Sequence, residues 1–401
     1  MTSDSLFVPV GRARRLGGFK PPWRILLLAV ATLFALLVGS TAAHLTVLSP
    51  TGSHPVGRDR VVLVDADRPE SHTPESGDVR SVPIQLWYPA EADTGTPAAY
   101  VDELDGIAEG LTASGTLSGV QVAALFIVRT GALDGAAIAA GRHPVIVLSP
   151  GNQTNVAFYG SLAEELASHG YLVVGVDHPF QVAATTIAGG QVAIYDTAMD
   201  TGDVGSSVAA KIDERVADVM FVLDSFRSDD AKLAPFVARA DLNRIGVLGH
   251  SNGGLTAFEV CRADPTLDAC LNMDGQGAGG PFGNQSDASA PPVPFLFLTK
   301  ETLLHPAIGN RFEAARSSAV RAVVPDASHD NFTDGPLFQP GINPMTTSAQ
   351  RVMTSVRSVT LAFFDQWLME SRDRPYDGLV APADIFINVY PLGDFEPIPA
   401  Q

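Results

Sequence analysis

The run Gly249-His250-Ser251-Asn252-Gly253 has the pattern G-x-S-x-G, which is typical of a nucleophile elbow. In such an elbow a serine occupies a sharp turn between a strand and a helix, and only small neighbours leave room for the turn. Gly249 and Gly253 are those neighbours, an apolar run ending at Leu248 precedes them, and a helix-like segment follows. The sequence therefore predicts that the hydroxyl of Ser251 is the nucleophile of a serine hydrolase.

A serine hydroxyl attacks a carbonyl carbon when a base removes its proton and a carboxylate orients that base. Asp274 follows the predicted strand after the elbow, and His329 follows a later predicted strand. The order Ser, Asp, His is the one that an α/β-hydrolase requires. We therefore predict Ser251 as nucleophile, His329 as general acid and base, and Asp274 as the orienting carboxylate. Glu301, at the end of the strand between Asp274 and His329, is the alternative acid.

The negative charge that develops on the substrate oxygen needs two fixed hydrogen-bond donors. One predicted donor is the backbone N–H of Asn252, because it opens the helix after Ser251. The second is predicted in the loop Ser149-Pro150-Gly151-Asn152-Gln153, which follows an earlier strand, as the backbone N–H of Asn152.

Other polar and thiol side chains have simpler interpretations. His250 is too close to Ser251 in sequence to turn its ring onto the hydroxyl, so it is predicted to be structural. His178 ends another predicted strand and either lines the pocket or packs in the body. Cys261 and Cys270 are predicted to form a disulfide, the alternative being two buried thiols. No histidine pair lies beside them at metal-ligand spacing, and the predicted chemistry needs neither a metal nor a cofactor.

Apolar runs of strand length alternate with amphipathic segments of helix length from residue 143 onward. The strands are expected at 145–148, 171–176, 245–248, 269–273, 293–298 and 321–325, and the helices at 156–169, 207–227 and 355–369. Such alternation predicts an α/β-hydrolase fold, with a mainly parallel central sheet and helices on both faces.

Segments outside this alternation are expected to complete the catalytic domain, residues 50–401. Two early strands, at 61–64 and 82–88, are expected to be antiparallel. Residues 92–141 are rich in Ala, Gly and Thr, with helical patterning near residues 120–129, and are predicted to be an insertion that could form a lid. The apolar residues among the last thirty are expected to pack back on the body.

The N-terminal segment predicts export. Residues 1–24 are basic and are expected to stay in the cytoplasm, whereas residues 25–48 are largely apolar. That apolar segment is either a cleaved signal peptide or a transmembrane anchor, so the body is either secreted or held outside the cell membrane. The formal net charge of −18 comes from acidic residues beyond this segment, and an acidic body argues against nucleic acid as a partner.

Several of these segments together resemble the secreted platelet-activating-factor acetylhydrolase family of the α/β-hydrolase superfamily. The resemblance covers roughly residues 80–370, and it departs from the family pattern at Pro150 and Asn252. It is carried by Pro144-Val145-Ile146-Val147-Leu148-Ser149-Pro150-Gly151, Leu166-Ala167-Ser168-His169-Gly170-Tyr171, Gly249-His250-Ser251-Asn252-Gly253-Gly254, Met273-Asp274 and Ser328-His329-Asp330-Asn331-Phe332.

The resemblance implies a carboxylic ester hydrolase that acts on a small-molecule ester or lipid. It favours Asp274 over Glu301, since the acid of that family follows the strand after the elbow. The implied substrates are short or oxidised acyl chains of phospholipids. A cutinase-like polyester or triacylglycerol lipase is the alternative enzyme, and a non-catalytic surface binding protein is the alternative of another class. The sequence leaves the oligomeric state open.

Overall fold

The computed structural model describes residues 47–75, 77–91, 94–200, 202, 204–228, 230–275, 291–300, 319–338, 347–369 and 388–391. These residues belong to one compact unit, His44–Gln401. Residues 1–46, which include most of the predicted signal or anchor, lie outside the described part. Among the described residues, no helix is long and apolar enough to cross a membrane.

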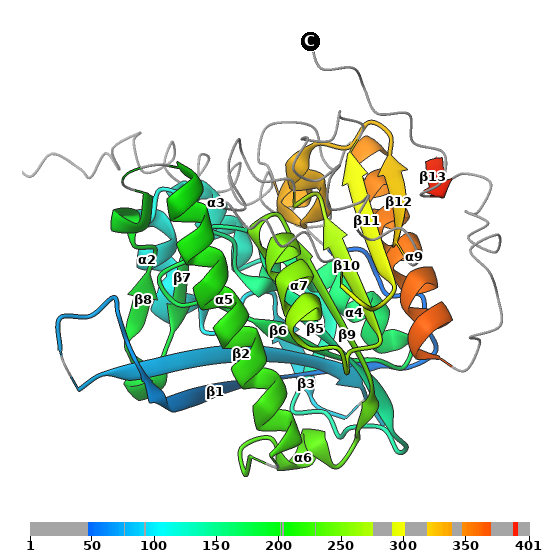
Figure 1. The fold of residues 1–401 in the computed structure, drawn as a ribbon, viewed down its shortest axis with the longest axis horizontal. Helices are drawn as coiled ribbons and strands as arrows, with labels where there is room; N and C mark the ends of the chain where they lie inside the picture. Colours follow the sequence, from blue (N-terminus) through cyan, green and yellow to red (C-terminus); the bar gives the residue numbers. More distant parts are fainter. Residues whose placement is uncertain are drawn as a thin grey trace, which may run out of the picture. The chain divides into compact units, whose positions relative to one another are not determined.

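A single large sheet dominates the described unit (Figure 1). Its eleven strands are ordered β13-β12-β11-β10-β9-β5-β6-β2-β1-β4-β3. In chain order they are β1 (Val56–Pro69), β2 (Val79–Pro89), β3 (Thr96–Ala99), β4 (Arg129–Asp134), β5 (His143–Ser149), β6 (Leu172–Val176), β9 (Ala240–His250), β10 (Ala269–Met273), β11 (Phe295–Lys300), β12 (Ala319–Val324) and β13 (Asn388–Pro391). A separate antiparallel pair is formed by β7 (Ala184–Thr186) and β8 (Val192–Ile194).

The helices between these strands vary widely in length. The α-helices are α2 (Leu104–Ala113), α3 (Gly119–Leu125), α4 (Gly160–Ser168), α5 (Val204–Arg227), α6 (Ala234–Val237), α7 (Asn252–Ala263) and α9 (Thr347–Leu368). Short 3-10 helices are η1 (Val156–Tyr159), η2 (Ala188–Gly190), η3 (Thr197–Asp200), η4 (His329–Phe332) and η5 (Gly335–Phe338).

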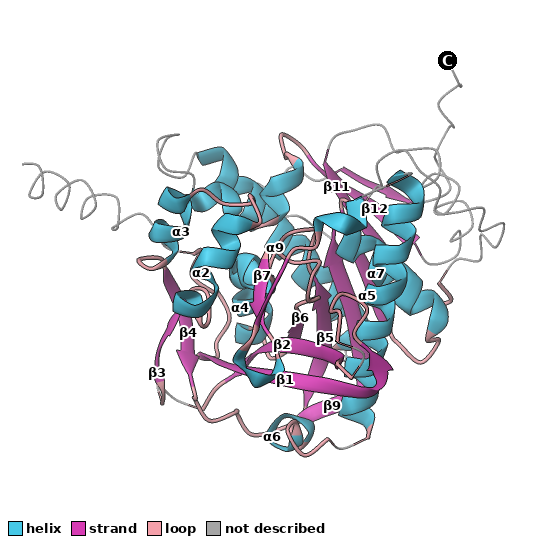
Figure 2. Ribbon diagram, turned by 90° about the vertical axis from the view of Figure 1, so that its left-hand side faces the viewer, coloured by secondary structure: helices cyan, strands magenta, loops and turns pink. Residues whose placement is uncertain are grey.

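The predicted α/β architecture is confirmed. Strands β5, β6 and β9 to β12 run parallel to one another, whereas β1 and β2 pair antiparallel as predicted. Helices α5 and α7 cover one face of the sheet and α4 and α9 the other, as Figures 1 and 2 show from two directions.

Strand β5 shows why both faces must be covered. Side chains alternate across a strand, so Val145 and Val147 pack with the α5 and α7 side, and Ile146 and Leu148 pack with the α4 and α9 side. All four side chains are buried. A strand with no polar face is stable only between two helical layers, which is why these strands have no alternating polar pattern in sequence.

Several predicted boundaries are wrong in detail. The helix expected at 156–169 begins as the 3-10 helix η1, and the helices expected from residues 207 and 355 begin at Val204 and Thr347. The helical patterning expected near 120–129 ends at Leu125, since Arg129 begins a strand. The segment 92–141 is also more than an insertion, because its strands β3 and β4 extend the sheet beside β1. At the other edge β13 pairs with β12, so those C-terminal residues pack back as predicted.

The structure pairs Cys261 with Cys270, as predicted from the sequence. Cys261 lies in α7 and Cys270 in β10, with Cα atoms 6.5 Å apart, and both residues are buried. The bond therefore ties the helix that follows Ser251 to the strand that precedes Asp274.

We expect the double variant Cys261→Ala/Cys270→Ala to lose stability. The bond closes a loop of nine residues in sequence separation, and a loop of that size corresponds to about 2–3 kcal/mol of free energy of unfolding. Urea unfolding of the oxidised wild type, the reduced wild type and the double variant measures the loss. An unchanged midpoint in both the reduced protein and the variant would contradict it.

Glu164 is an acid buried in α4 that should make stability depend on pH. Its side chain accepts a hydrogen bond from the Gly131 N–H at 2.9 Å, and burial raises its pKa from 4.5 to about 7. The folded state holds this proton more tightly than the unfolded chain does. Glu164 therefore contributes stability that is complete below pH 4.5 and is lost as pH rises through 7.

We expect Glu164→Gln to remove this part of the pH dependence, because the amide oxygen can still accept from Gly131. Between pH 4.5 and 8 the wild type should lose up to about 3 kcal/mol relative to the variant, since one pKa unit corresponds to about 1.4 kcal/mol. Chemical denaturation at several pH values measures this difference. The matched control is Glu165→Gln: burial opposes ionisation of Glu165, but hydrogen bonds from His169 and Thr51 and the charge of Arg357 lower its pKa to about 2. The difference in free energy of unfolding between Glu165→Gln and the wild type should be constant between pH 5 and 8. Parallel pH dependences of that free energy for the wild type and Glu164→Gln would contradict the prediction.

Candidate active site

The turn predicted around Ser251 is present in the structure. Strand β9 ends at His250, Ser251 has φ 55° and ψ −120°, and α7 begins at Asn252. A positive φ is strained for a serine, and the neighbouring backbone holds it there. A Cβ atom on Gly249 would lie 2.1 Å from the carbonyl oxygen of Gly253, and one on Gly253 would lie 2.0 Å from that of Ser149. Glycine is therefore required at both positions by the close approach of backbone.

Asp274 and His329 meet beside this turn. Asp274 follows β10 and is 1% exposed, and His329 opens η4 after β12. The Nδ1 atom of His329 lies 2.7 Å from the Oδ2 atom of Asp274. Because the carboxylate accepts the proton on Nδ1, the Nε2 atom of the neutral ring is the nitrogen that is free to take a proton.

Ser251 and His329 line the same cavity, which has a volume of about 270 Å³. Within the described part of the chain, the hydroxyl of Ser251 makes no hydrogen bond to the His329 ring. Such contacts are often loose in ligand-free serine hydrolases and tighten when substrate binds. The shared cavity therefore provides the place where a substrate carbonyl could meet both groups.

His250 is fully buried and belongs to a hydrogen-bond chain with a fixed direction. The Gly151 N–H donates to the Tyr159 hydroxyl at 2.9 Å, and that hydroxyl lies 2.9 Å from His250 Nδ1. His250 Nε2 lies 3.1 Å from the carbonyl oxygen of His329, which can only accept. Nε2 therefore carries the ring proton and Nδ1 accepts from Tyr159.

Burial, reinforced by the neighbouring His329 ring, keeps the pKa of His250 well below its usual value. The ring is therefore neutral, as the direction of the chain requires. His250 has the structural role that the sequence predicted, and it links the loop at Gly151 to the loop at His329. Tyr159 was not anticipated, because nothing in its local sequence distinguishes it from an ordinary buried aromatic residue.

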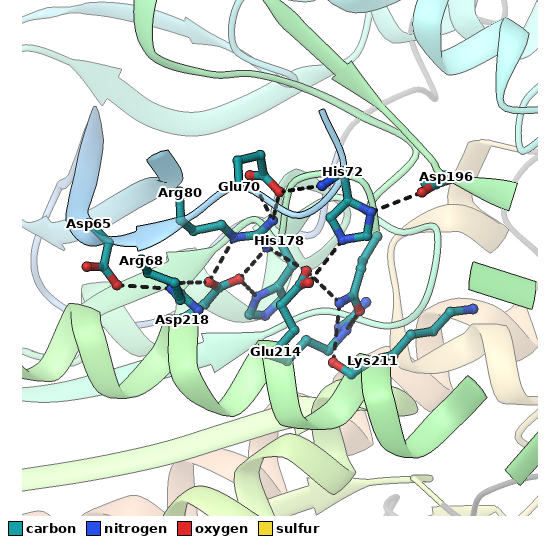
Figure 3. Close-up of polar contacts among 12 residues, drawn as sticks. Asp65, Arg68, Glu70, His72, Arg80, His178, Asp196, Lys211, Glu214 and Asp218 are labelled. Carbon is teal, nitrogen blue, oxygen red and sulfur yellow. Dashed lines mark hydrogen bonds and ion pairs between the residues drawn. The ribbon is translucent and has the colours of Figure 1, made fainter. Parts of the chain in front are cut away.

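His178 packs in the body and is absent from the lining of the cavity. Its Nδ1 atom lies 2.9 Å from Asp218 Oδ2, and its Nε2 atom lies 2.9 Å from the hydroxyl of Ser149. Figure 3 shows Asp218 between His178 and Arg80, within a buried network that also includes Arg68. Burial lowers the pKa of His178 to about 4, so the ring is neutral. Of the two interpretations that the sequence allowed, packing is correct.

The alternative acid, Glu301, lies outside the described residues. Its neighbour Lys300 is described, and its Nζ atom lies 3.8 Å from Asp274 Oδ2. Among the described residues, no group of three or more His, Cys, Asp and Glu side chains could hold a metal ion.

One wall of the cavity comes from the segment 92–141. Helix α3 and the loop before it contribute polar and apolar side chains, and most of the remaining lining comes from the loop after β5, the turn at Ser251 and the loop that carries His329. The lining residues from the first wall are Thr116, Leu117, Gln121 and Leu125. Asn152, one of the two predicted oxyanion donors, lines the cavity beside Ser251, and Asn252, the other, is the first residue of α7.

Comparison with known proteins shows which family this chain resembles. Residues 40–194 match the family model described as "Platelet-activating factor acetylhydrolase, isoform II". Over 335 residues, 72% of this chain and 76% of the relative, the sequence is 22% identical to the "Platelet-activating factor acetylhydrolase" of Cavia porcellus. A "Probable 1-alkyl-2-acetylglycerophosphocholine esterase" of Arthroderma benhamiae is 29% identical over 157 residues, which is 38% of this chain. The matched part spans about a third of that relative's length, 36%.

Over residues 40–194 the chain is similar to the platelet-activating-factor acetylhydrolase family. A solved structure of a ferulic acid esterase from Streptomyces cinnamoneus is also similar, with a TM-score of 0.68, 30% sequence identity, and coverage of 86% of this chain and 99% of that one. All of these relatives are named as esterases or as an acetylhydrolase, which confirms the predicted class of carboxylic ester hydrolase. The matched range of the family model ends before Ser251. The assignment of Ser251, Asp274 and His329 to the site therefore rests on the geometry described above.

We expect Gly253→Ala to reduce activity at least about 100-fold. The added Cβ would force Ser149 away from the elbow, and a shift of about 1 Å at a catalytic site costs about that factor. Steady-state hydrolysis of a p-nitrophenyl ester measures kcat. The matched control is Gly106→Ala, also in a helix, where a Cβ would meet no atom within 4 Å and activity should be unchanged. Wild-type kcat in folded Gly253→Ala would refute the steric argument.

Proposed function

We propose that this chain is an exported serine esterase that forms an acyl-enzyme on Ser251. The observation that carries the proposal is the 2.7 Å contact between His329 and Asp274, in a cavity that His329 shares with Ser251. His329 Nε2 takes the hydroxyl proton as Ser251 attacks the ester carbonyl, and Asp274 stabilises the charged ring that results. The same proton then goes to the departing alcohol. Water activated by His329 attacks the acyl-enzyme and releases the acid.

The proposed oxyanion hole consists of the backbone N–H groups of Asn252 and Asn152. Asn252 is at the N-terminus of α7, where backbone donors have no partner within the helix and the helix dipole favours negative charge. Asn152 lines the cavity in the loop after β5. An oxygen between these two donors would be stabilised as it gains charge.

The substrate that we propose is a carboxylic ester with a short or oxidised acyl chain, such as that of a phospholipid. The names of two relatives in the family support it, and a cavity of about 270 Å³ is compatible with a short acyl group. The similarity to a ferulic acid esterase favours a second candidate, an ester of an aromatic acid. Both candidates use the same catalytic residues and differ only in the acyl group.

Export is proposed on two grounds. The apolar segment 25–48 follows a basic N-terminus, and the buried pair Cys261–Cys270 is the kind of bond that persists in an oxidising compartment. Whether the segment is a cleaved signal or an anchor is decided by N-terminal sequencing of the protein from its own host.

The test is hydrolysis of p-nitrophenyl esters from acetate to palmitate, with methyl ferulate and tributyrin added, by the purified full chain and its variants. We expect Ser251→Ala, His329→Ala and Asp274→Asn each to lower kcat at least about 10⁴-fold. Asp326→Asn is the matched control, because Asp326 also follows a strand and has a positive φ but is paired with Arg351 on the surface. Its kcat should equal that of the wild type.

The panel also separates the alternatives. Preference for acetate or butyrate supports the short-chain substrate, preference for methyl ferulate supports the aromatic one, and preference for tributyrin or palmitate indicates a lipase or cutinase-like enzyme. Loss of activity in Glu301→Gln but not in Asp274→Asn would move the acid to Glu301. A folded wild type that hydrolyses nothing and is not labelled by a fluorophosphonate at Ser251 would refute catalysis and favour a binding protein.

A further inference from the structure

Helix α5 presents a row of polar side chains to the interior. Lys211, Glu214, Arg215 and Asp218 are spaced three and four residues apart, so they share one face of the helix. Figure 3 shows Glu214 and Asp218 extending from α5 towards Arg80 and His178. Glu214 and Asp218 thus pair with charged or titratable groups, whereas Arg215 on the same face has different partners.

Arg215 is completely buried and binds only neutral acceptors. Its Nη1 atom donates to the carbonyl oxygen of Pro150 at 2.6 Å, Nη2 to that of Gly151 at 3.3 Å, and Nε to Gln181 Oε1 at 2.6 Å. Among the described residues, no carboxylate lies within ion-pair distance of it. Burial lowers its pKa to about 10, so the guanidinium is still charged at neutral pH.

Burying a cation without a direct carboxylate partner costs free energy of folding. Such a charge therefore indicates a function in its immediate surroundings. The local feature that Arg215 contacts is the loop after β5. Two consecutive carbonyl groups of this loop, those of Pro150 and Gly151, point at the guanidinium.

The direction of these carbonyl groups determines the direction of the N–H groups. In a trans peptide the C=O and N–H bonds point to opposite sides, and the described chain contains no cis peptide bond. The peptide between Pro150 and Gly151 is held at both ends, its oxygen by Arg215 and its N–H by the hydroxyl of Tyr159. The next peptide has its Gly151 oxygen on Arg215, so the N–H of Asn152 points away from α5.

We propose that Arg215 is the positioning residue of the oxyanion hole: by holding the Gly151 carbonyl it aims the Asn152 N–H at the cavity in which Ser251 reacts. This inference rests on the proposed function. A hydrogen bond to the carbonyl oxygen also polarises the peptide and strengthens the N–H at its other end as a donor. Asn152 is further held by its side chain, whose Nδ2 donates to the hydroxyl of Tyr195 at 3.2 Å.

The experiment compares Arg215→Met and Arg215→Lys with a matched buried arginine. Arg357 is that control, because it also donates to two consecutive carbonyl oxygens, those of Leu48 and Ser49, at 3.1 and 2.9 Å, and it is buried on α9. For each variant of the full chain we would measure kcat and KM on p-nitrophenyl acetate, the inhibition constant of phenylboronic acid, and the thermal midpoint. The boronate forms a tetrahedral adduct with the serine and so reports on the oxyanion hole.

We expect Arg215→Met to lower kcat about 10²- to 10³-fold, the usual cost of losing one oxyanion donor, with KM changed by no more than about threefold. The boronate should bind more weakly by a similar factor. Arg215→Lys should fall between wild type and Arg215→Met, since one ammonium group cannot hold both carbonyls in the arginine geometry. Arg357→Met should lower the thermal midpoint but leave kcat and boronate binding within about threefold of the wild type.

A folded Arg215→Met that keeps wild-type kcat and boronate affinity, or that loses only thermal stability as Arg357→Met does, would overturn the inference. If Arg215→Met does not fold, Arg215→Lys and Tyr159→Phe provide the same test, because Tyr159 holds the other end of the Pro150–Gly151 peptide. Unchanged kcat and boronate affinity in those two variants would also overturn it. Failure of the proposed function is distinguishable: the folded wild type would then hydrolyse nothing, or Ser251→Ala would retain hydrolysis, whatever the arginine variants do.

Discussion

The close approach of three backbone segments around Ser251 is the constraint on which the site depends. The loop after β5, the end of β9 and the first turn of α7 meet where glycines at 249 and 253 leave no room for a side chain. The Ser251 N–H also donates to the carbonyl oxygen of Met273 at 2.9 Å, which ties the turn to the end of β10. A strained serine of this kind costs about 1–3 kcal/mol, and the buried sheet on either side holds it in place. The strained conformation of Ser251 is therefore held by the backbone packed around it, which comes from the loop after β5, the end of β9 and the first turn of α7.

This approach also couples the groups that act in the proposed reaction. The chain from Gly151 through Tyr159 and His250 ends on the carbonyl oxygen of His329. It begins at a backbone N–H and ends at a backbone C=O, neither of which can reverse its role. The loop that supplies a proposed oxyanion donor and the loop that carries the proposed base are thus parts of one hydrogen-bonded unit. A displacement of either loop would therefore be transmitted to the other through the rigid rings of Tyr159 and His250.

The sequence predicted the central residues of the site because their positions follow from chain connectivity. In a parallel sheet, residues that follow neighbouring strands lie at the same edge, so Ser251, Asp274 and His329 could be placed together without knowledge of packing. The same logic could not find Tyr159 or Arg215. Arg215 lies in an amphipathic helix, where a lone cation is usually solvent-exposed, and its partners are 64 and 65 residues away. Strands β3 and β4 were missed since they are short and rich in small residues, and since β4 is placed by its pairing with β1, and β3 by its pairing with β4, rather than by an alternating pattern.

The site divides into a part fixed by the sheet and a part supplied by a local segment. Ser251, Asp274 and His329 follow strands that are buried on both faces, so their positions depend on the whole core. The wall formed by α3 and the loop before it lies outside the sheet, although Leu125, one of its side chains, is buried in the core that covers one face of the sheet. The two parts therefore differ in origin: the proposed catalytic residues are positioned by strands of the sheet, whereas α3 and the loop before it line the same cavity from the segment 92–141.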